Sequence, residues 1–318
     1  MKKTKIAILG ATSHIAKGLI SVFLQRGDFD LHLYARSSEK ISDFLTGLKK
    51  KSNDNFTIHD DYGNFLKIHY DVIINCVGVG TLKKIQGDYT RYFMVTEKYD
   101  NLVIQNLCDV NPDTLYISFS SGAIYGSDFS APFKENTING LKINHIDPNN
   151  YYAISRLNAE SKHRSFKDLN IVDLRIFSYF SRFADLEDGY FITELINAVS
   201  EKKVFKTDDT NIVRDYISPK DLFSMILKCI ETKKINSAFD VFSAKPVEKK
   251  EILDYFSAEF NLKYEVDNTL SYTGATGAKN IYYSTYDKAM KIGYKPEFSS
   301  LDVIKQESNY ILNKKVYG

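Results

Sequence analysis

The sequence contains no apolar run that approaches the roughly 18 residues needed to cross a bilayer. Neither sign of charge is in excess, because 42 basic and 40 acidic residues leave a formal net charge of +2, and the basic residues are dispersed. No internal repeat, low-complexity tract or Pro/Gly-rich linker divides the 318 residues. We therefore expect one large α/β unit or two closely joined domains, with no membrane insertion and no nucleic-acid partner.

Cysteine is also scarce, with only Cys76, Cys108 and Cys229. They stand far apart without the spacing of a metal site, so no bound metal is expected. Cys76 and Cys229 lie in apolar runs, which predicts small core residues. A reduced, cytoplasmic protein is the simplest interpretation. The Met-Lys-Lys start leads directly into an apolar run at residues 6–9, which is too short for a signal peptide and predicts a strand.

The first 27 residues show the order strand, glycine turn, helix. In this context the helix N-terminus offers unpaired N–H groups to the pyrophosphate of a dinucleotide. Two of the usual glycines are replaced, by Ser13 and Ala16 in one alignment of the fingerprint and by His14 and Ala16 in the other. A small side chain still permits close approach, and Ser13 can donate its own hydrogen bond. The turn residues expected at the cofactor are Gly10, Thr12, Ser13, His14 and Ile15.

An acidic residue is missing where the second strand, at residues 31–35, ends. In a protein that binds NAD, an acidic side chain near this point holds the ribose hydroxyls. Here the chain continues with Arg36, Ser37 and Ser38, and a guanidinium with two hydroxyls suits a 2′-phosphate. The sequence therefore predicts NADP rather than NAD, with a surface arginine at a strand end as the alternative.

Later segments continue the alternation of strands and helices. Residues 71–78 form a nearly continuous apolar run, as expected of a parallel strand that is covered on both faces. A strand at 115–119 delivers Ser120 and Ser121 at its carboxyl end, where doubly wound sheets place their chemistry. Residues 92–110 predict a helix that is apolar on more than one side. Further strands are expected at 56–60, 171–177 and 238–242, and helices around Tyr152, up to Ile230 and at 247–256.

Tyr152 and Arg156 are four residues apart, so they project from one face of the helix that carries them. A phenol becomes a useful acid or base near neutral pH only when a neighbouring cation stabilises the phenolate. The hydroxyl of Ser121 can hold a carbonyl oxygen during reduction. The pattern predicts a catalytic set of Ser121, Tyr152 and Arg156, with a surface i,i+4 pair at a helix start as the alternative.

Three segments together resemble the extended branch of the short-chain dehydrogenase/reductases, which contains nucleotide-sugar epimerases, dehydratases and 4-ketoreductases. They are residues 120–126 (SSGAIYG), the Tyr152 segment, and residues 214–216 (RDY) with Asp221. The resemblance extends from Ile6 to about Pro296, with Arg156 in place of the usual lysine. It implies an α/β fold with a Rossmann-type doubly wound parallel sheet in residues 1–176. Residues 177–318 would form a smaller, partly discontinuous substrate domain, with segments around 204–245 returning to the sheet.

The resemblance also implies roles for individual residues. The arginine at the position of Arg214 commonly contacts the substrate diphosphate in the family, with a structural ion pair as the alternative. A helix such as 92–110 often meets a partner subunit, which implies a homodimer. Cofactor contacts are implied for Gly10, Thr12, Ser13, His14, Ile15, Arg36, Ser37, Asp60, Cys76, Val77, Gly78, Tyr152 and Arg156. Substrate contacts are implied for Ser121, Gly122, Ala123, Ser178 and Arg214.

Two departures from the family narrow the reaction. The 4,6-dehydratases carry an Asp-Glu pair where this chain has Gly122 and Ala123, and the cysteine of the C3/C5 epimerases is absent. Ketone reduction, alcohol oxidation and C4 epimerisation remain. A preference for NADP favours net reduction, which predicts an NADP(H)-dependent reductase of the C4 keto group of a nucleotide-activated 6-deoxy sugar. The alternatives are a nucleotide-sugar 4-epimerase with retained NAD(P) and a non-catalytic NAD(P)-binding sensor or assembly protein.

Overall fold

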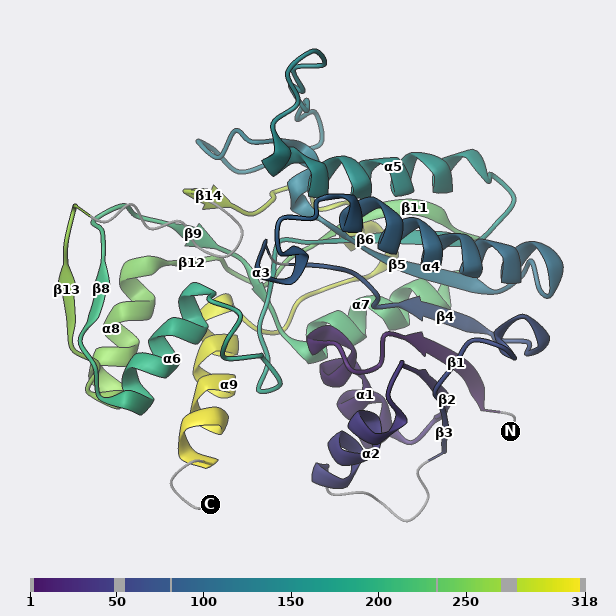
Figure 1. Ribbon diagram of the computed structural model, residues 1–318, viewed down its shortest axis with the longest axis horizontal. Helices are drawn as coiled ribbons and strands as arrows, with labels where there is room; N and C mark the ends of the chain where they lie inside the picture. Colours follow the sequence, from purple (N-terminus) through teal and green to yellow (C-terminus); the bar gives the residue numbers. More distant parts are fainter. Residues whose placement is uncertain (1–2, 49–54, 81, 233, 270–278, 315–318) are drawn as a thin grey trace.

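The computed structural model describes residues 3–48, 55–80, 82–232, 234–269 and 279–314. At its centre is a seven-stranded parallel sheet in the order β3-β2-β1-β4-β5-β6-β11 (Figure 1). The strands are β1 (Thr4–Leu9), β2 (Phe29–Tyr34), β3 (Phe56–His59), β4 (Val72–Asn75), β5 (Leu115–Ser121), β6 (Ile171–Ile176) and β11 (Asn236–Val241). The doubly wound parallel sheet expected from the sequence is confirmed.

Two strands end more than one residue away from the expected position. The strand expected at 71–78 ends at Asn75, because the next three residues leave the sheet and form a loop beside the glycine turn. The strand expected at 115–119 continues through Ser121, which pairs with Ile176 of β6. Ser121 is therefore fixed by the sheet itself.

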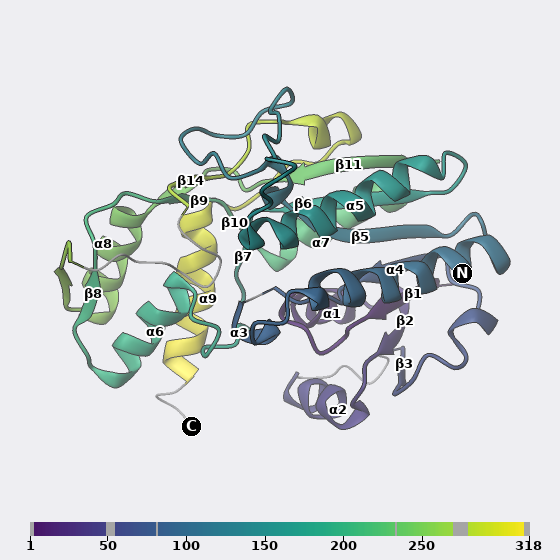
Figure 2. The same ribbon diagram turned by 45° about the horizontal axis from the view of Figure 1, so that its top comes forward.

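Helices cover both faces of the sheet (Figures 1 and 2). One face carries α1 (His14–Arg26), α2 (Ser38–Gly47) and α7 (Pro219–Glu231), and the other carries α4 (Thr90–Asp109) and α5 (Tyr151–Ser165). Because successive side chains of a strand point to opposite faces, Ile6 and Ile8 pack with α1 and α7, whereas Ala7 and Leu9 pack with α4. Burial on both faces explains the unbroken apolar runs at residues 6–9 of β1 and 72–74 of β4.

A second lobe lies to one side of the sheet, at the left of Figure 1. Its core joins α6 (Phe191–Glu201), α8 (Lys249–Phe260) and α9 (Ser300–Lys314). Short strands complete it: β7 (Ser178–Tyr179) with β10 (Tyr216–Ile217), β8 (Phe205–Thr207) with β13 (Tyr264–Val266), and β9 (Val213–Arg214) with β12 (Val247–Glu248) and β14 (Ile281–Tyr282). The remaining short elements are α3 (Leu82–Ile85), η1 (Phe65–Lys67), η2 (Gly122–Tyr125), η3 (Pro148–Asn150) and η4 (Lys288–Ile292).

The chain returns from the second lobe to the sheet through α7 and β11. The division at residue 176 stays a prediction. Within the described ranges, no helix is both long and apolar enough to cross a membrane.

Asp215 and Asp221, which the sequence motif contains, join the two parts of the molecule. Asp215 is buried and accepts hydrogen bonds from the Ser243 N–H at 3.0 Å and the Ser300 hydroxyl at 3.2 Å. Burial raises the pKa of Asp215 to about 6. Asp221, in the first turn of α7, accepts from the Glu297 N–H at 2.8 Å. Both carboxylates therefore anchor loops of the C-terminal part of the chain.

A fully buried histidine connects α5 to the sheet and to α4. The ring nitrogens of His163 lie 2.8 Å from Asp173 Oδ1 and 2.7 Å from Asp100 Oδ1. Burial alone lowers the pKa of His163, but the hydrogen bonds to the two carboxylates outweigh it and raise the pKa to about 9. The imidazolium donates to both carboxylates, so the folded protein holds a proton here that the unfolded chain releases near its ordinary pKa of 6.5.

Because the folded protein holds this proton more tightly than the unfolded chain, we expect the free energy of unfolding to depend on pH. The contribution of His163 is complete below pH 6.5 and is lost as the pH rises through 9, an effect of about 3 kcal/mol in the free energy of unfolding. Urea unfolding of the wild type and of His163→Gln across this range is expected to show a stability difference that shrinks with rising pH. The exposed His69→Gln is the control. Parallel stability curves for wild type and His163→Gln would contradict the assignment.

Candidate active site

The predicted site residues follow consecutive strands at one edge of the sheet. Gly10 follows β1, Arg36 comes after β2, Asp60 after β3 and Cys76 after β4, while Ser121 ends β5. Because all these strands are parallel, their carboxyl ends lie at the same edge, where doubly wound sheets bind their ligands. The structure therefore brings segments far apart in the sequence to one surface.

The glycine turn is built for close backbone approach. Gly10 has a φ of +70°, and a Cβ there would lie 3.0 Å from the carbonyl carbon of Cys76. Ser13, which replaces a glycine of the fingerprint, caps α1 by accepting a hydrogen bond from the Ala16 N–H at 3.3 Å. The substitution thus keeps the turn and adds a cap, and the helix N-terminus remains suited to a pyrophosphate.

The other predicted residues of this turn point in three directions. Thr12 lines an open pocket between α1 and α2, and Ile15 packs against the sheet core. The ring of His14 packs edge-on against Tyr179 of β7, with 4.9 Å between the ring centroids. Burial lowers the pKa of His14 to about 4, which keeps its imidazole neutral.

The loop after β4 is held by a buried chain of hydrogen bonds. Asn75 accepts from the Val77 N–H at 3.0 Å and donates to the Tyr116 hydroxyl at 3.1 Å, which in turn donates to Asp100 at 2.8 Å. Cys76 is partly buried against the sheet core, and burial raises the pKa of its thiol. Cys229 is fully buried, as expected of a core residue.

Tyr152 and Arg156 lie on one face of α5, as their spacing predicts. The guanidinium carbon of Arg156 lies 5.3 Å from the centroid of the Tyr152 ring. Arg156 Nη1 donates to the carbonyl oxygen of Phe119 at 3.3 Å, which ties α5 to β5 two residues before Ser121. A positive charge is thus fixed beside the aromatic ring of Tyr152, in cation–π geometry.

Ser121 has a partner that the sequence did not indicate. Its hydroxyl accepts from the Ala123 N–H at 3.2 Å and lies 3.1 Å from the hydroxyl of Tyr282. Tyr282 comes from β14 of the second lobe and is buried. The ammonium of Lys279 lies 4.0 Å from the centroid of the Tyr282 ring. Burial, with a smaller contribution from Arg214, lowers the pKa of Lys279 to about 7.

The predicted substrate residues are placed less uniformly. Gly122 is required by packing, since a Cβ there would lie 2.2 Å from the ring of Phe177. Ser178 lies in β7 and pairs with Tyr216 of β10. Among other contacts, the Arg214 guanidinium donates to the carbonyl oxygens of Val213, Lys279 and Asn280. These bonds tie β9 to the segment before β14, and a role of Arg214 toward a diphosphate stays a prediction.

The model of the NAD dependent epimerase/dehydratase family matches residues 6–242. The chain belongs to this family. No curated protein sequence matches this chain significantly.

Solved structures of nucleotide-sugar epimerases and dehydratases share the fold of this chain. UDP-N-acetylglucosamine 4-epimerase from Methanobrevibacter ruminantium M1 is 18% identical with a TM-score of 0.79, over 99% of this chain and 100% of that chain. UDP-glucuronic acid 4-epimerase from Bacillus cereus, in complex with UDP-glucuronic acid and NAD, is 17% identical with a TM-score of 0.79 over the same shares. The dTDP-glucose 4,6-dehydratase DesIV from Streptomyces venezuelae is 12% identical with a TM-score of 0.77, over 99% and 98%.

Proposed function

We propose that the protein is an NADP(H)-dependent oxidoreductase that reduces the C4 keto group of a nucleotide-activated 6-deoxy sugar. The observation that carries the proposal is the placement of Ser121 and the Tyr152–Arg156 pair at the same sheet edge as the Gly10 turn. The turn fits a dinucleotide, because Gly10 turns the chain at a positive φ close against the Cys76 backbone and α1 begins directly after the turn. Bound NADPH would supply the hydride.

The protein's own residues account for the proton and the oxygen. Tyr152 would donate its proton to the oxygen of the ketone as that oxygen becomes a hydroxyl. Arg156 would stabilise the phenolate that this transfer leaves behind. Ser121 would hold the oxygen through its hydroxyl, whose orientation is restrained by Tyr282.

The residues next to Ser121 favour reduction over dehydration. Elimination of water from the sugar requires an acid for the leaving hydroxyl and a base for the C5 proton. Gly122 and Ala123 supply neither, and the ring of Phe177 leaves no room for a side chain at position 122. The protein would therefore differ in function from DesIV, whose fold it shares.

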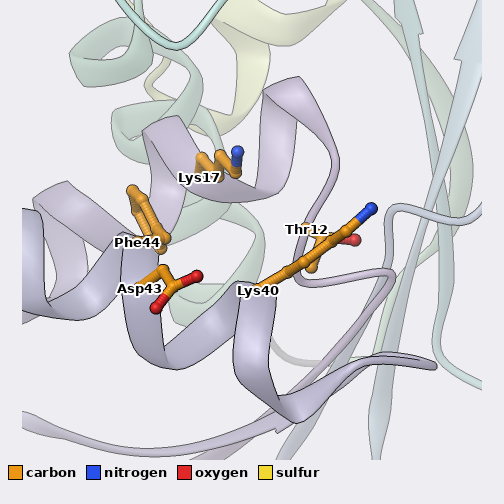
Figure 3. Close-up of a pocket in the computed structure, with 5 residues that line it drawn as sticks. All are labelled: Thr12, Lys17, Lys40, Asp43 and Phe44. Carbon is orange, nitrogen blue, oxygen red and sulfur yellow. The ribbon is translucent and has the colours of Figure 1, made fainter.

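A basic pocket beside the end of β2 supports NADP. It has a volume of about 430 Å³ and is lined by Thr12, Lys17, Lys40, Asp43 and Phe44 (Figure 3). Figure 3 shows Lys40 extending past Thr12, with Lys17 above Phe44 and Asp43. Ser37 caps α2, the helix that carries three of the lining residues, and the exposed Arg36 directly precedes this cap. The two ammonium groups of the pocket outweigh its single carboxylate and suit a 2′-phosphate. Arg36, which precedes the capping Ser37, could add a guanidinium at the rim.

The cofactor proposal makes a quantitative prediction. NADPH should bind at least about tenfold tighter than NADH, a difference of about 1.4 kcal/mol. Arg36→Asp is expected to abolish or reverse this preference, because a carboxylate repels the 2′-phosphate. Fluorescence titration of both cofactors measures the ratio, with the exposed Lys263→Asp in the second lobe as control. Equal affinities in the wild type would remove the basis for NADP.

Reduction is tested with NADPH and a panel of dTDP-, CDP-, GDP- and UDP-linked 4-keto sugars, followed by the loss of NADPH absorbance. The proposal expects consumption of one NADPH per ketone reduced with at least one sugar. An epimerase would instead interconvert C4 isomers with its own retained cofactor and no net consumption. A sensor or assembly protein would bind the cofactor and turn over nothing.

A homodimer through α4 and α5 completes the proposal. The two helices lie side by side on one face of the sheet, where Lys162 Nζ donates to Asn101 Oδ1 at 2.8 Å. Met94 of α4 is 66% exposed, an apolar side chain available to a second copy. Light scattering at micromolar concentration should give the mass of two chains, and the mass of one chain would contradict the dimer. The cytoplasmic location stays a prediction.

A further inference from the structure

The guanidinium of Arg156 lies in a narrow space between β5, α5 and the loop after β4. Its Nη1 donates to the Phe119 carbonyl oxygen at 3.3 Å, and its carbon lies 5.3 Å from the centroid of the Tyr152 ring. Its Nη2 lies directly against Gly78, where an added Cβ would come within 2.5 Å. Both terminal nitrogens of the side chain therefore have a fixed neighbour.

The loop that carries Gly78 is also confined from its other side. Cys76 donates its N–H to the end of β1 at 2.9 Å. A Cβ at Gly10 would lie 3.0 Å from the carbonyl carbon of Cys76, so the glycine turn packs closely against the same loop. A methyl group added at position 78 would therefore displace the flexible end of Arg156 rather than the loop backbone.

We propose that Gly78 is a positioning residue for Arg156, and that the missing side chain at position 78 is what permits an arginine to take the place of the family's lysine. The inference rests on the proposed function, in which Arg156 serves Tyr152 and the cofactor. The guanidinium is held by the Nη1 bond to the Phe119 carbonyl oxygen and by its contact with the Tyr152 ring, since Nε is buried and has no hydrogen-bond partner among the described residues. Displacing the guanidinium would break that bond and move the positive charge away from Tyr152 and the cofactor.

Lysine at position 156 would not depend on Gly78 in this way. Its side chain ends in a single ammonium, without the second arm that lies against residue 78. The two positions should therefore be coupled: alanine at 78 is harmful with Arg156 and tolerated with lysine.

A double-mutant cycle tests this coupling with the wild type, Gly78→Ala, Arg156→Lys and the double variant. We expect Gly78→Ala to raise the NADPH dissociation constant at least about tenfold in the Arg156 protein and less than about twofold in the Arg156→Lys protein. Fluorescence titration measures the constants. Gly47→Ala, at the end of α2 with no atom within 4 Å of the added methyl, is the matched control and should change nothing.

Equal weakening in both backgrounds would mean that the methyl group meets the cofactor or deforms the loop, and it would overturn the proposal. No weakening in either would overturn it as well. If the wild type binds neither NADPH nor NADH, the proposed function has failed. The coupling between Gly78 and Arg156 is then tested by the melting temperatures of the same four proteins. Gly78→Ala should lower the melting temperature only in the Arg156 background, through loss of the bond to Phe119; equal shifts would refute the pairing.

Discussion

Tyr152→Phe is expected to lower turnover of a 4-keto nucleotide sugar by about 10²- to 10⁴-fold, the usual range for a lost general acid. The substitution removes only the hydroxyl. The aromatic ring keeps its contacts with Tyr92, at 5.4 Å between ring centroids, and with Arg156. NADPH affinity should therefore stay nearly unchanged, so the loss falls on kcat. Steady-state kinetics with fluorescence titration of the cofactor measure both quantities.

The neighbouring Tyr151→Phe provides a matched control. The ring of Tyr151 packs on Tyr89 at 5.7 Å and on Phe93 at 6.2 Å between ring centroids. It belongs to the same helix turn and loses the same atom, yet it has no place in the proposed proton transfer. Tyr151→Phe should keep wild-type turnover. A fully active Tyr152→Phe would show that the Tyr152–Arg156 pair is only a surface feature of α5.

Arg156→Ala is expected to lose about 10²-fold or more in turnover, whereas Arg156→Lys keeps measurable activity. Arginine does not relay protons, because its guanidinium remains protonated in proteins. What it contributes is a fixed positive charge beside Tyr152 and a bond to the Phe119 carbonyl oxygen. Lysine keeps the positive charge but lacks the planar guanidinium, whereas alanine lacks both the charge and the hydrogen bond to the Phe119 carbonyl oxygen. Wild-type turnover in Arg156→Ala would contradict the electrostatic role.

Local patterns predicted much of this molecule. The strands β1 and β4 were recognisable because a parallel strand covered on both faces carries an unbroken apolar run. The Tyr152–Arg156 pair was recognisable because residues four apart on a helix share a face, which depends on no other part of the chain. The fingerprint was recognisable despite its replaced glycines, because a strand, a turn and a helix follow one another there as expected. Ser13 shows how such a replacement is accommodated, since it caps α1.

Contacts between segments that are distant in the chain could not be predicted from the sequence. Tyr282 meets Ser121 across 161 residues, and nothing in its own neighbourhood marks it for the site. Lys17 and Lys40 reach one pocket only because α1 and α2 pack on the same face of the sheet. The fit between Gly78 and Arg156 likewise depends on where the loop after β4 leaves the sheet.

The most direct measurement follows the hydride itself. NADPH deuterated at C4 of the nicotinamide, in each of its two epimeric forms, is incubated with the protein and a dTDP-4-keto-6-deoxy sugar, and the product is examined by NMR and mass spectrometry. The account predicts deuterium at C4 of the sugar from one epimer only, with the loss of this transfer in Tyr152→Phe. Conversion of the sugar without deuterium at C4, or transfer that survives in Tyr152→Phe, would contradict it.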